Sequence, residues 1–158
     1  MSGETREDYL REAIRVAADS VETGGGPFGA VVVRDGEVIV RAANRVTRNN
    51  DPTAHAEVEA IREACRILGT FQLEGCEIYT SSEPCPMCLG AVYWARPKAV
   101  YYANAREVAR AAGFDDHHIY EEFCMPVEER RYPIVQLEIE GADEPFRAWA
   151  ARDDRVEY

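Results

Sequence analysis

The sequence predicts a single α/β domain in which helices cover a mixed β-sheet. Three observations support this prediction. Several segments repeat apolar residues at helical spacing, and short β-branched runs lie between them. Two of these runs are joined by Asp35-Gly36, which is a strong signal for an antiparallel hairpin. The later runs alternate with helical segments, and helical crossovers connect parallel strands.

The first half of the chain is predicted to hold two helices that flank the hairpin. Thr5 and Asp8 resemble a capping box at the start of the first helix, and Gly24 lies just past its end. Gly69 follows the second helix in the same way. The expected elements are a helix at 5–22, strands at 28–34 and 37–43, a polar loop at 44–53 and a helix at 54–68.

The second half alternates shorter strands and helices. Pro97 separates a helix from the strand after it, and Gly113-Phe114-Asp115-Asp116 separates two helical segments. The run from Ile134 to Ile139 is predicted as the last strand. With no repeat or linker in its 158 residues, the whole chain (1–158) is expected to form one domain. The expected elements are strands at 76–81, 99–103 and 134–139, and helices at 85–95, 105–112, 119–124 and 144–152.

The acidic balance of the chain argues against a nucleic-acid partner. There are 29 acidic and 18 basic side chains, a formal net charge of −11, and the basic residues lie scattered. Phosphate backbones are bound mainly by clustered Lys and Arg, and the longest basic run is Arg130-Arg131. We therefore expect a small, near-neutral ligand and no nucleic acid.

Cysteine usage and the lack of long apolar runs indicate a cytoplasmic protein. The five cysteines are an odd number, which suggests reduced thiols rather than a disulfide framework. No run approaches the ~20 apolar residues of a membrane span, and no signal peptide is recognisable. We therefore expect no membrane partner.

Two short motifs carry the chemistry, His55-Ala56-Glu57 and Pro84-Cys85-Pro86-Met87-Cys88. Cys85 and Cys88 are three residues apart at a helix start, where the helix dipole stabilises thiolates. His55 lies at the start of another helix, and helices that follow strands of one sheet bring their N-termini to one edge. Two thiolates and an imidazole suit tetrahedral zinc. His55, Cys85 and Cys88 are therefore predicted to bind one Zn²⁺ per chain.

Three protein ligands leave a fourth position for water or hydroxide, which is typical of catalytic rather than structural zinc. Glu57, two residues from His55, then reaches that water and acts as general acid and base. His117, His118 and Cys124 are candidates for closing the site, which would instead make a non-catalytic structural zinc module. A redox-active dithiol is a further interpretation of the C-x-x-C pair, and it leaves His55 and Glu57 without a role.

The combination of H-x-E with a later P-C-x-x-C is the signature of zinc-dependent nucleobase deaminases. Over nearly its whole length the sequence resembles bacterial guanine deaminases of the cytidine deaminase superfamily. The zinc signature is common to the superfamily, whereas the Gly113 to Asp116 segment and Tyr158 point to guanine. The segments that carry the resemblance are 26–30, 49–57, 82–91, 93–99, 112–116 and 157–158.

The resemblance implies a three-layer α/β/α fold with a mixed five-stranded sheet. It also implies a homodimer in which the C-terminal segments, about 127–158, are exchanged between subunits. Asp116 would be a second catalytic acid–base group beside Glu57, and Tyr158 would reach the partner's site as a lid. The residues that would contact the substrate are Asn44, at the purine edge, and Phe28, Ala56 and Trp94, around the pocket.

Local alternatives remain for some of these assignments. Asn44 fits a turn-initiating position, and Asp115 and Asp116 both fit a cap of the helix near His118. The expected reaction is zinc-dependent hydrolysis of guanine, a small-molecule purine, to xanthine and ammonia. The alternatives are a deaminase of guanosine or of another aminated heterocycle, such as a triazine or a cytosine-type base. A tRNA adenosine deaminase shares the motif, but the charge disfavours it.

Overall fold

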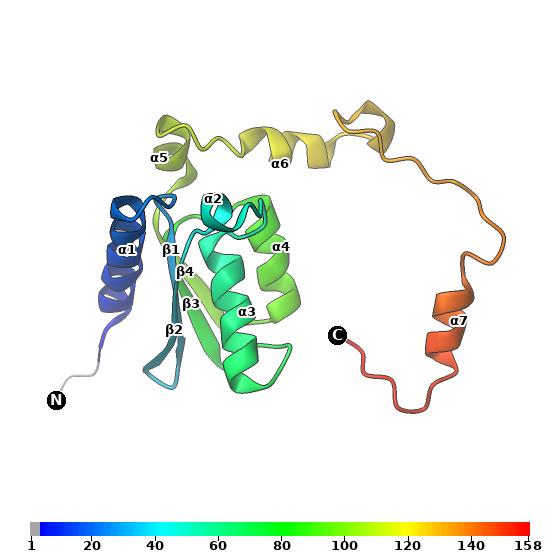
Figure 1. The fold of residues 1–158 in the computed structure, drawn as a ribbon, viewed down its shortest axis with the longest axis horizontal. Coiled ribbons are helices and arrows are strands. Elements are labelled where there is room, and N and C mark those ends of the chain that lie inside the picture. Colours follow the sequence, from blue (N-terminus) through cyan, green and yellow to red (C-terminus); the bar gives the residue numbers. More distant parts are fainter. Residues whose placement is uncertain (1–3) are drawn as a thin grey trace. The chain divides into compact units, whose positions relative to one another are not determined.

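The computed structural model describes residues 4–158, and the chain forms two compact units, residues 1–117 and 118–158. The first unit contains a four-stranded sheet with the strand order β2-β1-β3-β4 (Figure 1). β1 runs antiparallel to β2 and to β3, whereas β3 and β4 are parallel. The prediction of a mixed sheet is thus confirmed. The strands are β1 (Gly29–Arg34), β2 (Glu37–Ala43), β3 (Cys76–Ser82) and β4 (Ala99–Asn104).

The local signals at the start of the chain predicted the first elements correctly. The Asp8 N–H donates to Oγ1 of Thr5 at 3.3 Å, and the Thr5 N–H donates to the Asp8 carboxylate at 2.9 Å. This capping box opens α1 (Arg6–Glu22). Asp35 and Gly36 adopt φ angles of 52° and 80°, the left-handed pair that a two-residue hairpin turn requires.

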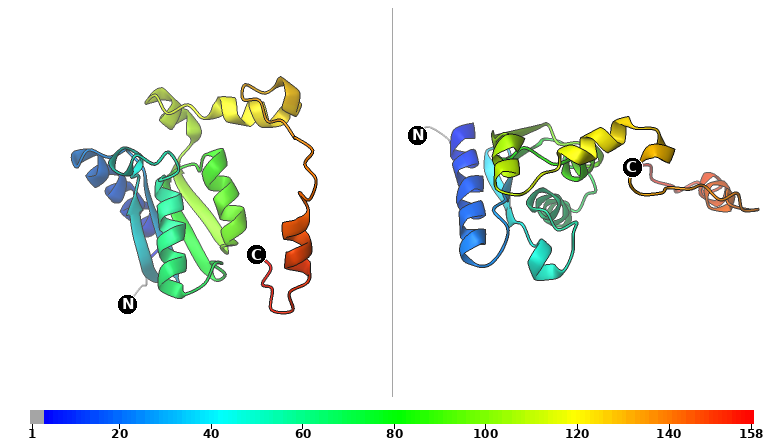
Figure 2. Two further views of the ribbon diagram at one scale, coloured as in Figure 1. Left: turned by 45° about the vertical axis from the view of Figure 1, so that its right-hand side comes forward. Right: turned by 90° about the horizontal axis from the view of Figure 1, so that it is seen from above.

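Helices cover both faces of the sheet in the first unit. α1 packs on β1 and β3, while α3 (Ala56–Leu68) packs on β1 and β2 beside α4 (Pro86–Ala95). Figure 2 shows the sheet between α1 and the α3–α4 pair. Each face has its own buried cluster, with Tyr9, Val31 and Tyr79 in the one under α1. The first unit therefore has the three expected layers.

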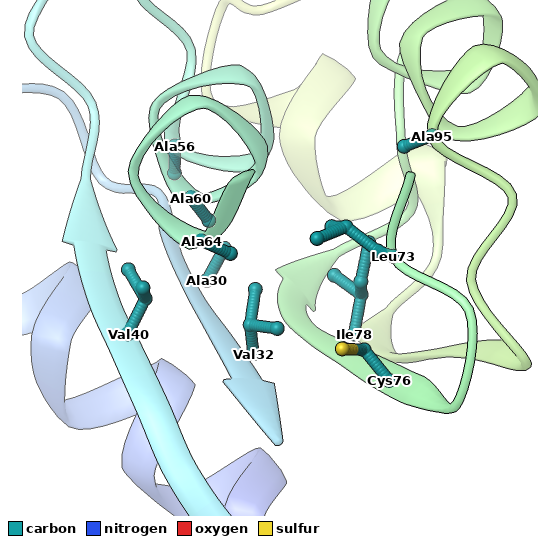
Figure 3. Packing of buried hydrophobic residues seen from close by; sticks show 10 residues of the cluster. All are labelled: Ala30, Val32, Val40, Ala56, Ala60, Ala64, Leu73, Cys76, Ile78 and Ala95. Atoms are coloured by element: carbon teal, nitrogen blue, oxygen red, sulfur yellow. The ribbon is translucent and has the colours of Figure 1, made fainter. Parts of the chain in front are cut away.

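Alanines on α3 bring that helix close to the sheet. Ala56, Ala60 and Ala64 recur every four residues, so they lie on one face, and none of them is exposed. Figure 3 shows this face toward the side chains of the strands. The buried members of the cluster are Ala30, Val32, Val40, Ala56, Ala60, Ala64, Leu73, Cys76, Ile78 and Ala95.

Shorter helices occupy the loops and the C-terminal part. A one-turn helix, α2 (Val46–Asn49), interrupts the segment that was expected to be a plain loop, 44–53. Among residues 4–158, no helix is long and apolar enough to cross a bilayer. The remaining elements are α5 (Arg106–Ala111), α6 (His117–Cys124), the 3₁₀ turn η1 (Val127–Glu129) and α7 (Glu144–Ala150).

The expected fifth strand is absent from the described chain. Residues 134–139 belong to no strand, and Ile134, Leu137 and Ile139 are exposed. A strand is stable only where a neighbouring strand takes up its backbone hydrogen bonds. The alternating apolar pattern shows that residues 134–139 could form a strand. It does not show whether a neighbouring strand is available to pair with them. The prediction of five strands is therefore wrong for the single chain.

The second unit, residues 118–158, buries none of its side chains, all of which the structure describes. Its internal contacts are local, such as the bonds from Arg130 to the carbonyls of Phe123 and Met125. The segment predicted to be exchanged between subunits, 127–158, lies entirely within this unit. Its large exposed apolar side chains are Phe123, Met125, Val127, Tyr132, Ile134, Val135, Leu137, Ile139, Phe146, Trp149, Val156 and Tyr158.

Substitutions of Leu73 and Phe71 test which of these two side chains belongs to the buried core. Leu73 is fully buried in the cluster under α3, whereas Phe71 is half-exposed. Leu73→Ala should lower the free energy of unfolding by about 2–5 kcal/mol, because it leaves a cavity. Phe71→Ala should change it by less than about 0.5 kcal/mol. Urea denaturation measures both values, and equal effects of the two substitutions would contradict this description of the core.

Candidate active site

The predicted metal ligands lie at the N-termini of two neighbouring helices. His55 is the N-cap residue of α3. The chain leaves β3 at Ser82 and enters α4 with Cys85 as N-cap, which places Cys88 in the first helical turn. Oriented N–H groups at a helix start favour negative charge. Both sulfurs therefore lie where thiolates are stabilised.

The three ligand atoms have the spacing that tetrahedral zinc needs. Nδ1 of His55 lies 3.5 Å from Sγ of Cys85 and 3.5 Å from Sγ of Cys88. Zn–S bonds of ~2.3 Å and a Zn–N bond of ~2.0 Å at tetrahedral angles put sulfur and nitrogen about 3.5 Å apart. The donor set and its geometry therefore fit zinc.

No fourth protein ligand joins this cluster among residues 4–117 of the first unit. The group of side chains that could hold a metal consists of His55, Cys85 and Cys88, with ligand atoms within 4.8 Å of one another. His118 and Cys124, two of the residues that could have closed the site, lie in the second unit. Three ligands are the number found in catalytic zinc sites, which keep one position open.

The pKa values of Cys85 and Cys88 indicate that this pair favours binding of a cation. A hydrogen bond with the side chain of Cys88 does most to lower the pKa of Cys85, to about 4. The His55 ring and the Cys88 backbone N–H stabilise the same thiolate. The pKa of Cys88 is raised, first by this bond to Cys85 and then by burial. One thiolate thus forms at neutral pH, and a dication is needed to stabilise the second beside it.

Glu57 lies against the metal ligands without belonging to them. Its Oε2 atom is 3.4 Å from Sγ of Cys88, and the side chain is buried in the first turn of α3. Burial raises the pKa of Glu57, and the charge of Cys85 adds to this effect. A buried carboxyl beside a metal centre is placed to accept a proton from a metal-bound water and to donate it again.

Asp115 and Asp116 have different surroundings in the structure, although the local sequence gave no reason to distinguish them. Asp115 is exposed, lies 3.5 Å from the guanidinium of Arg110, and accepts the His117 N–H at 3.0 Å. It is the helix-capping carboxylate. The Asp116 side chain is partly buried, and its pKa is raised by that burial and by the charge of Cys85. Asp116 is therefore the carboxylate within electrostatic range of the metal ligands.

The residues expected around the substrate divide into two groups. Asn44 is buried, and its Oδ1 accepts the Val46 N–H at 3.2 Å, so it does initiate the turn into α2. Its N–H donates to the Phe28 carbonyl at 3.0 Å, which joins two expected pocket residues. Ala56 is buried at the start of α3. Trp94 is exposed on α4, and Tyr158 is exposed in the second unit.

Two contacts near the site had no signal in the sequence. The ring of Phe114 meets the ring of Phe28 edge-on, with centroids 5.0 Å apart. Glu83, in the loop before Cys85, accepts the backbone N–H of Arg106 at 3.1 Å and its guanidinium at 2.8 Å. Both contacts join segments that are far apart in the chain, so neither periodicity nor motif spacing could have indicated them.

Comparison with known proteins decides the family. The model of the cytidine and deoxycytidylate deaminase zinc-binding region matches residues 3–104. The chain belongs to this deaminase family. Its matched region ends with β4 and includes both zinc motifs.

Relatives of the deaminase differ in how much of the chain they match. Guanine deaminase from Bacillus subtilis (strain 168) is 54% identical over 153 residues, which is 96% of this chain and 98% of that protein. An X-ray structure of guanine deaminase from Bacillus subtilis matches with a TM-score of 0.96 and 52% identity, over 98% of this chain and 99% of that one. A tRNA-specific adenosine deaminase from Aquifex aeolicus (strain VF5) is 47% identical over 62% of this chain and 65% of its own length.

Zinc analysis of the purified deaminase tests the metal centre. We expect about one zinc per chain by elemental analysis, and Cys88→Ala should lose it because two ligands bind zinc much more weakly than three. Cys65→Ala is the matched control, since Cys65 is a half-buried thiol outside the metal group. Zinc retained at wild-type content in Cys88→Ala would contradict the ligand assignment.

Proposed function

We propose that this deaminase hydrolyses guanine to xanthine and ammonia. The observation that carries the proposal is the extent of the guanine deaminase likeness. The shared zinc region ends at residue 104, whereas the match to guanine deaminase spans 153 residues and so includes most of the chain beyond it. The tRNA-specific relative matches only 62% of the chain. The part of the sequence that would define the substrate therefore agrees with guanine.

Glu57 is the proton carrier in this proposal. His55, Cys85 and Cys88 would hold the zinc ion, which would lower the pKa of a coordinated water toward ~7. Glu57 accepts a proton from the attacking water and delivers it to the purine ring nitrogen as C2 becomes tetrahedral. The same carboxyl then takes the proton of the new C2 hydroxyl and passes it to the amine, so that the C2 carbonyl forms as the C–N bond breaks, and guanine and water give xanthine and ammonia. The raised pKa of Glu57 suits both directions of transfer.

Asp116 is proposed as a second acid–base group for departure of the amine. Its partly buried carboxyl has a raised pKa and lies within the field of Cys85. Substrate orientation is assigned to Asn44 at the purine edge, with Phe28, Ala56 and Trp94 as pocket walls. Asn44 and Phe28 are already held together by a backbone hydrogen bond of 3.0 Å. This arrangement supports a preformed wall of the pocket.

We further propose a homodimer with exchanged C-terminal segments. α4 carries no charged residue, yet Leu89, Tyr93 and Trp94 on it are exposed in the single chain. A helix that is apolar all round is normally covered by other parts of a protein. The structure describes every residue of the second unit, and none of the apolar side chains of this unit is buried. Covering these surfaces with a second copy would also bring Tyr158 to the partner's site.

Other substrates on the same scaffold are the alternatives. Guanosine, triazines and cytosine-type bases carry the same kind of amine-bearing ring carbon. A tRNA substrate is disfavoured by the net charge of −11, because phosphate contacts need clustered cations. We place the enzyme in the cytoplasm, because zinc ligation by thiolates requires cysteines to stay reduced.

Ammonia release from a substrate panel tests the proposed reaction. With guanine, guanosine, cytosine, cytidine and adenine offered separately, we expect rapid release from guanine, with one xanthine formed per ammonia. Glu57→Gln should keep its zinc and lose guanine turnover by at least about 10²-fold, since it cannot transfer the proton. Faster ammonia release from guanosine or cytosine than from guanine would show that guanine is not the preferred substrate. Full guanine turnover by Glu57→Gln would refute the role of Glu57.

A pair of adjacent substitutions tests the second carboxylate. Asp116→Asn should lower kcat on guanine by about 10²-fold or more, because the amide cannot donate the proton. Asp115→Asn should leave kcat within about threefold of wild type, because Asp115 caps a helix at the surface. Equal losses in the two variants would remove Asp116 from the mechanism.

Subunit complementation tests the lid. A chain truncated after Arg155 lacks Tyr158 and should turn guanine over at least about tenfold more slowly, because the site stays open to water. Refolding it together with full-length Glu57→Gln should restore turnover, since hybrid dimers hold an intact Glu57 facing a partner's Tyr158. Each chain refolded alone is the control. No gain on mixing would show that Tyr158 does not act between subunits.

A further inference from the structure

The ring contact between Phe28 and Phe114 joins the sheet to the segment that carries Asp116. The ring centroids are 5.0 Å apart and the planes meet at 88°, the edge-to-face geometry that aromatic pairs favour. Phe114 is 47% exposed, so one side of its ring contacts protein and the other faces outward. Two residues further along lies Asp116.

Phe28 is the fixed partner in this pair. Its ring packs against the buried cluster between the sheet and α3. Its N–H donates to the Gly26 carbonyl at 2.9 Å, and its carbonyl accepts the Asn44 N–H at 3.0 Å. The next residue, Gly29, donates to Oγ of Ser81 in β3 at 3.0 Å. Phe28 is thus held by contacts on both sides.

Phe114, in contrast, belongs to a segment with few contacts to the sheet. α5 buries none of its residues, all of which the structure describes. Its first turn is held by the bonds from Arg106 to Glu83. At its other end, Gly113 turns the chain with a φ angle of 96°, and the Phe114 N–H donates to the Ala109 carbonyl at 3.0 Å.

The turn after α5 is therefore stiff but needs an anchor. Several bonds lie within residues 109–117, including the one from the His117 N–H to Asp115 at 3.0 Å. They fix the shape of the turn and leave its position to contacts with the rest of the unit. The Phe114 ring supplies such a contact, and it meets the residue whose backbone also holds Asn44.

We propose that Phe114 is a positioning residue that holds the turn carrying Asp116 in place through its edge-on contact with Phe28. The inference rests on the proposed role of Asp116 in the deamination. Removal of the ring lets the turn shift, and a misplacement of about 1 Å at a reacting group can cost as much as 10²-fold in rate. Substrate binding through Asn44 and zinc binding do not depend on Phe114.

Hydrogen exchange tests the anchoring independently of the reaction. Phe114→Ala should speed amide exchange in peptides covering 113–117 by at least about tenfold, because the turn opens more often. Peptides covering 55–57 and 85–88 should keep their wild-type exchange, and the zinc content should stay unchanged. Phe71→Ala, which removes another half-exposed phenyl ring, should leave all these peptides unchanged. Unchanged exchange at 113–117 in Phe114→Ala would overturn the proposal.

A double-mutant cycle tests whether Phe114 acts through Asp116. With guanine, or with the substrate that the ammonia panel identifies, Phe114→Ala should lower kcat by about 10- to 100-fold and change KM by less than about threefold. Phe114→Tyr keeps the ring edge and should restore kcat to within about threefold. In an Asp116→Asn background, Phe114→Ala should cost less than about threefold more.

The outcomes of this cycle separate two kinds of failure. If the wild type turns over another substrate but not guanine, the proposed function is refuted. The double-mutant cycle measured with that other substrate then still tests whether Phe114 acts through Asp116. Full additivity of the two substitutions shows that Phe114 does not act through Asp116. A raised KM with unchanged kcat shows instead that Phe114 is only a pocket wall. Either of these two results overturns the inference.

Discussion

The convergence of two helix N-termini is the constraint on which the site depends. α3 and α4 lie side by side on one face of the sheet and begin at the same edge, so His55 and Cys85 meet although 30 residues separate them. The alanine face of α3 makes this approach close, because it leaves room for the helix to pack directly on β1 and β2. The same helix start places Glu57 in a buried position against Cys88. One packing arrangement therefore fixes both the three potential metal ligands and Glu57.

The chemistry of the site follows from that burial. A carboxyl removed from water is easier to protonate, and two thiols that share one proton need a cation before both can ionise. In the proposed reaction these two effects would be complementary, because a metal ion that stabilises the thiolates would also supply the water that gives its proton to Glu57. The first unit offers three protein ligands, which is the number typical of catalytic zinc sites.

The sequence indicated those parts of the fold and site that depend on local residues. The Thr5–Asp8 capping box, the Asp35-Gly36 turn and the three zinc ligands each have a short motif with a defined geometry, and each lies as predicted. Residues 134–139 have a strand pattern without a pairing partner in the chain, so the expected fifth strand does not form. A pattern of side chains cannot supply the neighbour that a strand requires.

The features of the site that could not be predicted from the sequence depend on contacts between residues far apart in the chain. Asp115 and Asp116 are equivalent locally, and they differ only in that one caps a helix at the surface while the other lies within the field of Cys85. The Phe28–Phe114 pair joins positions 86 residues apart and has no motif. The roles assigned to Asn44, Trp94 and Tyr158 stay predictions, because they concern a substrate and a second subunit.

We expect His55, Cys85 and Cys88 to form an open, catalytic zinc centre with three protein ligands. X-ray absorption spectroscopy of the zinc-loaded protein tests it most directly, because the spectrum reports the number and type of ligand atoms. The account predicts two sulfurs at ~2.3 Å, one imidazole nitrogen at ~2.0–2.1 Å and one further light atom that is not an imidazole. A third sulfur, or a second imidazole, would mean that the protein itself closes the site, and this would contradict the account.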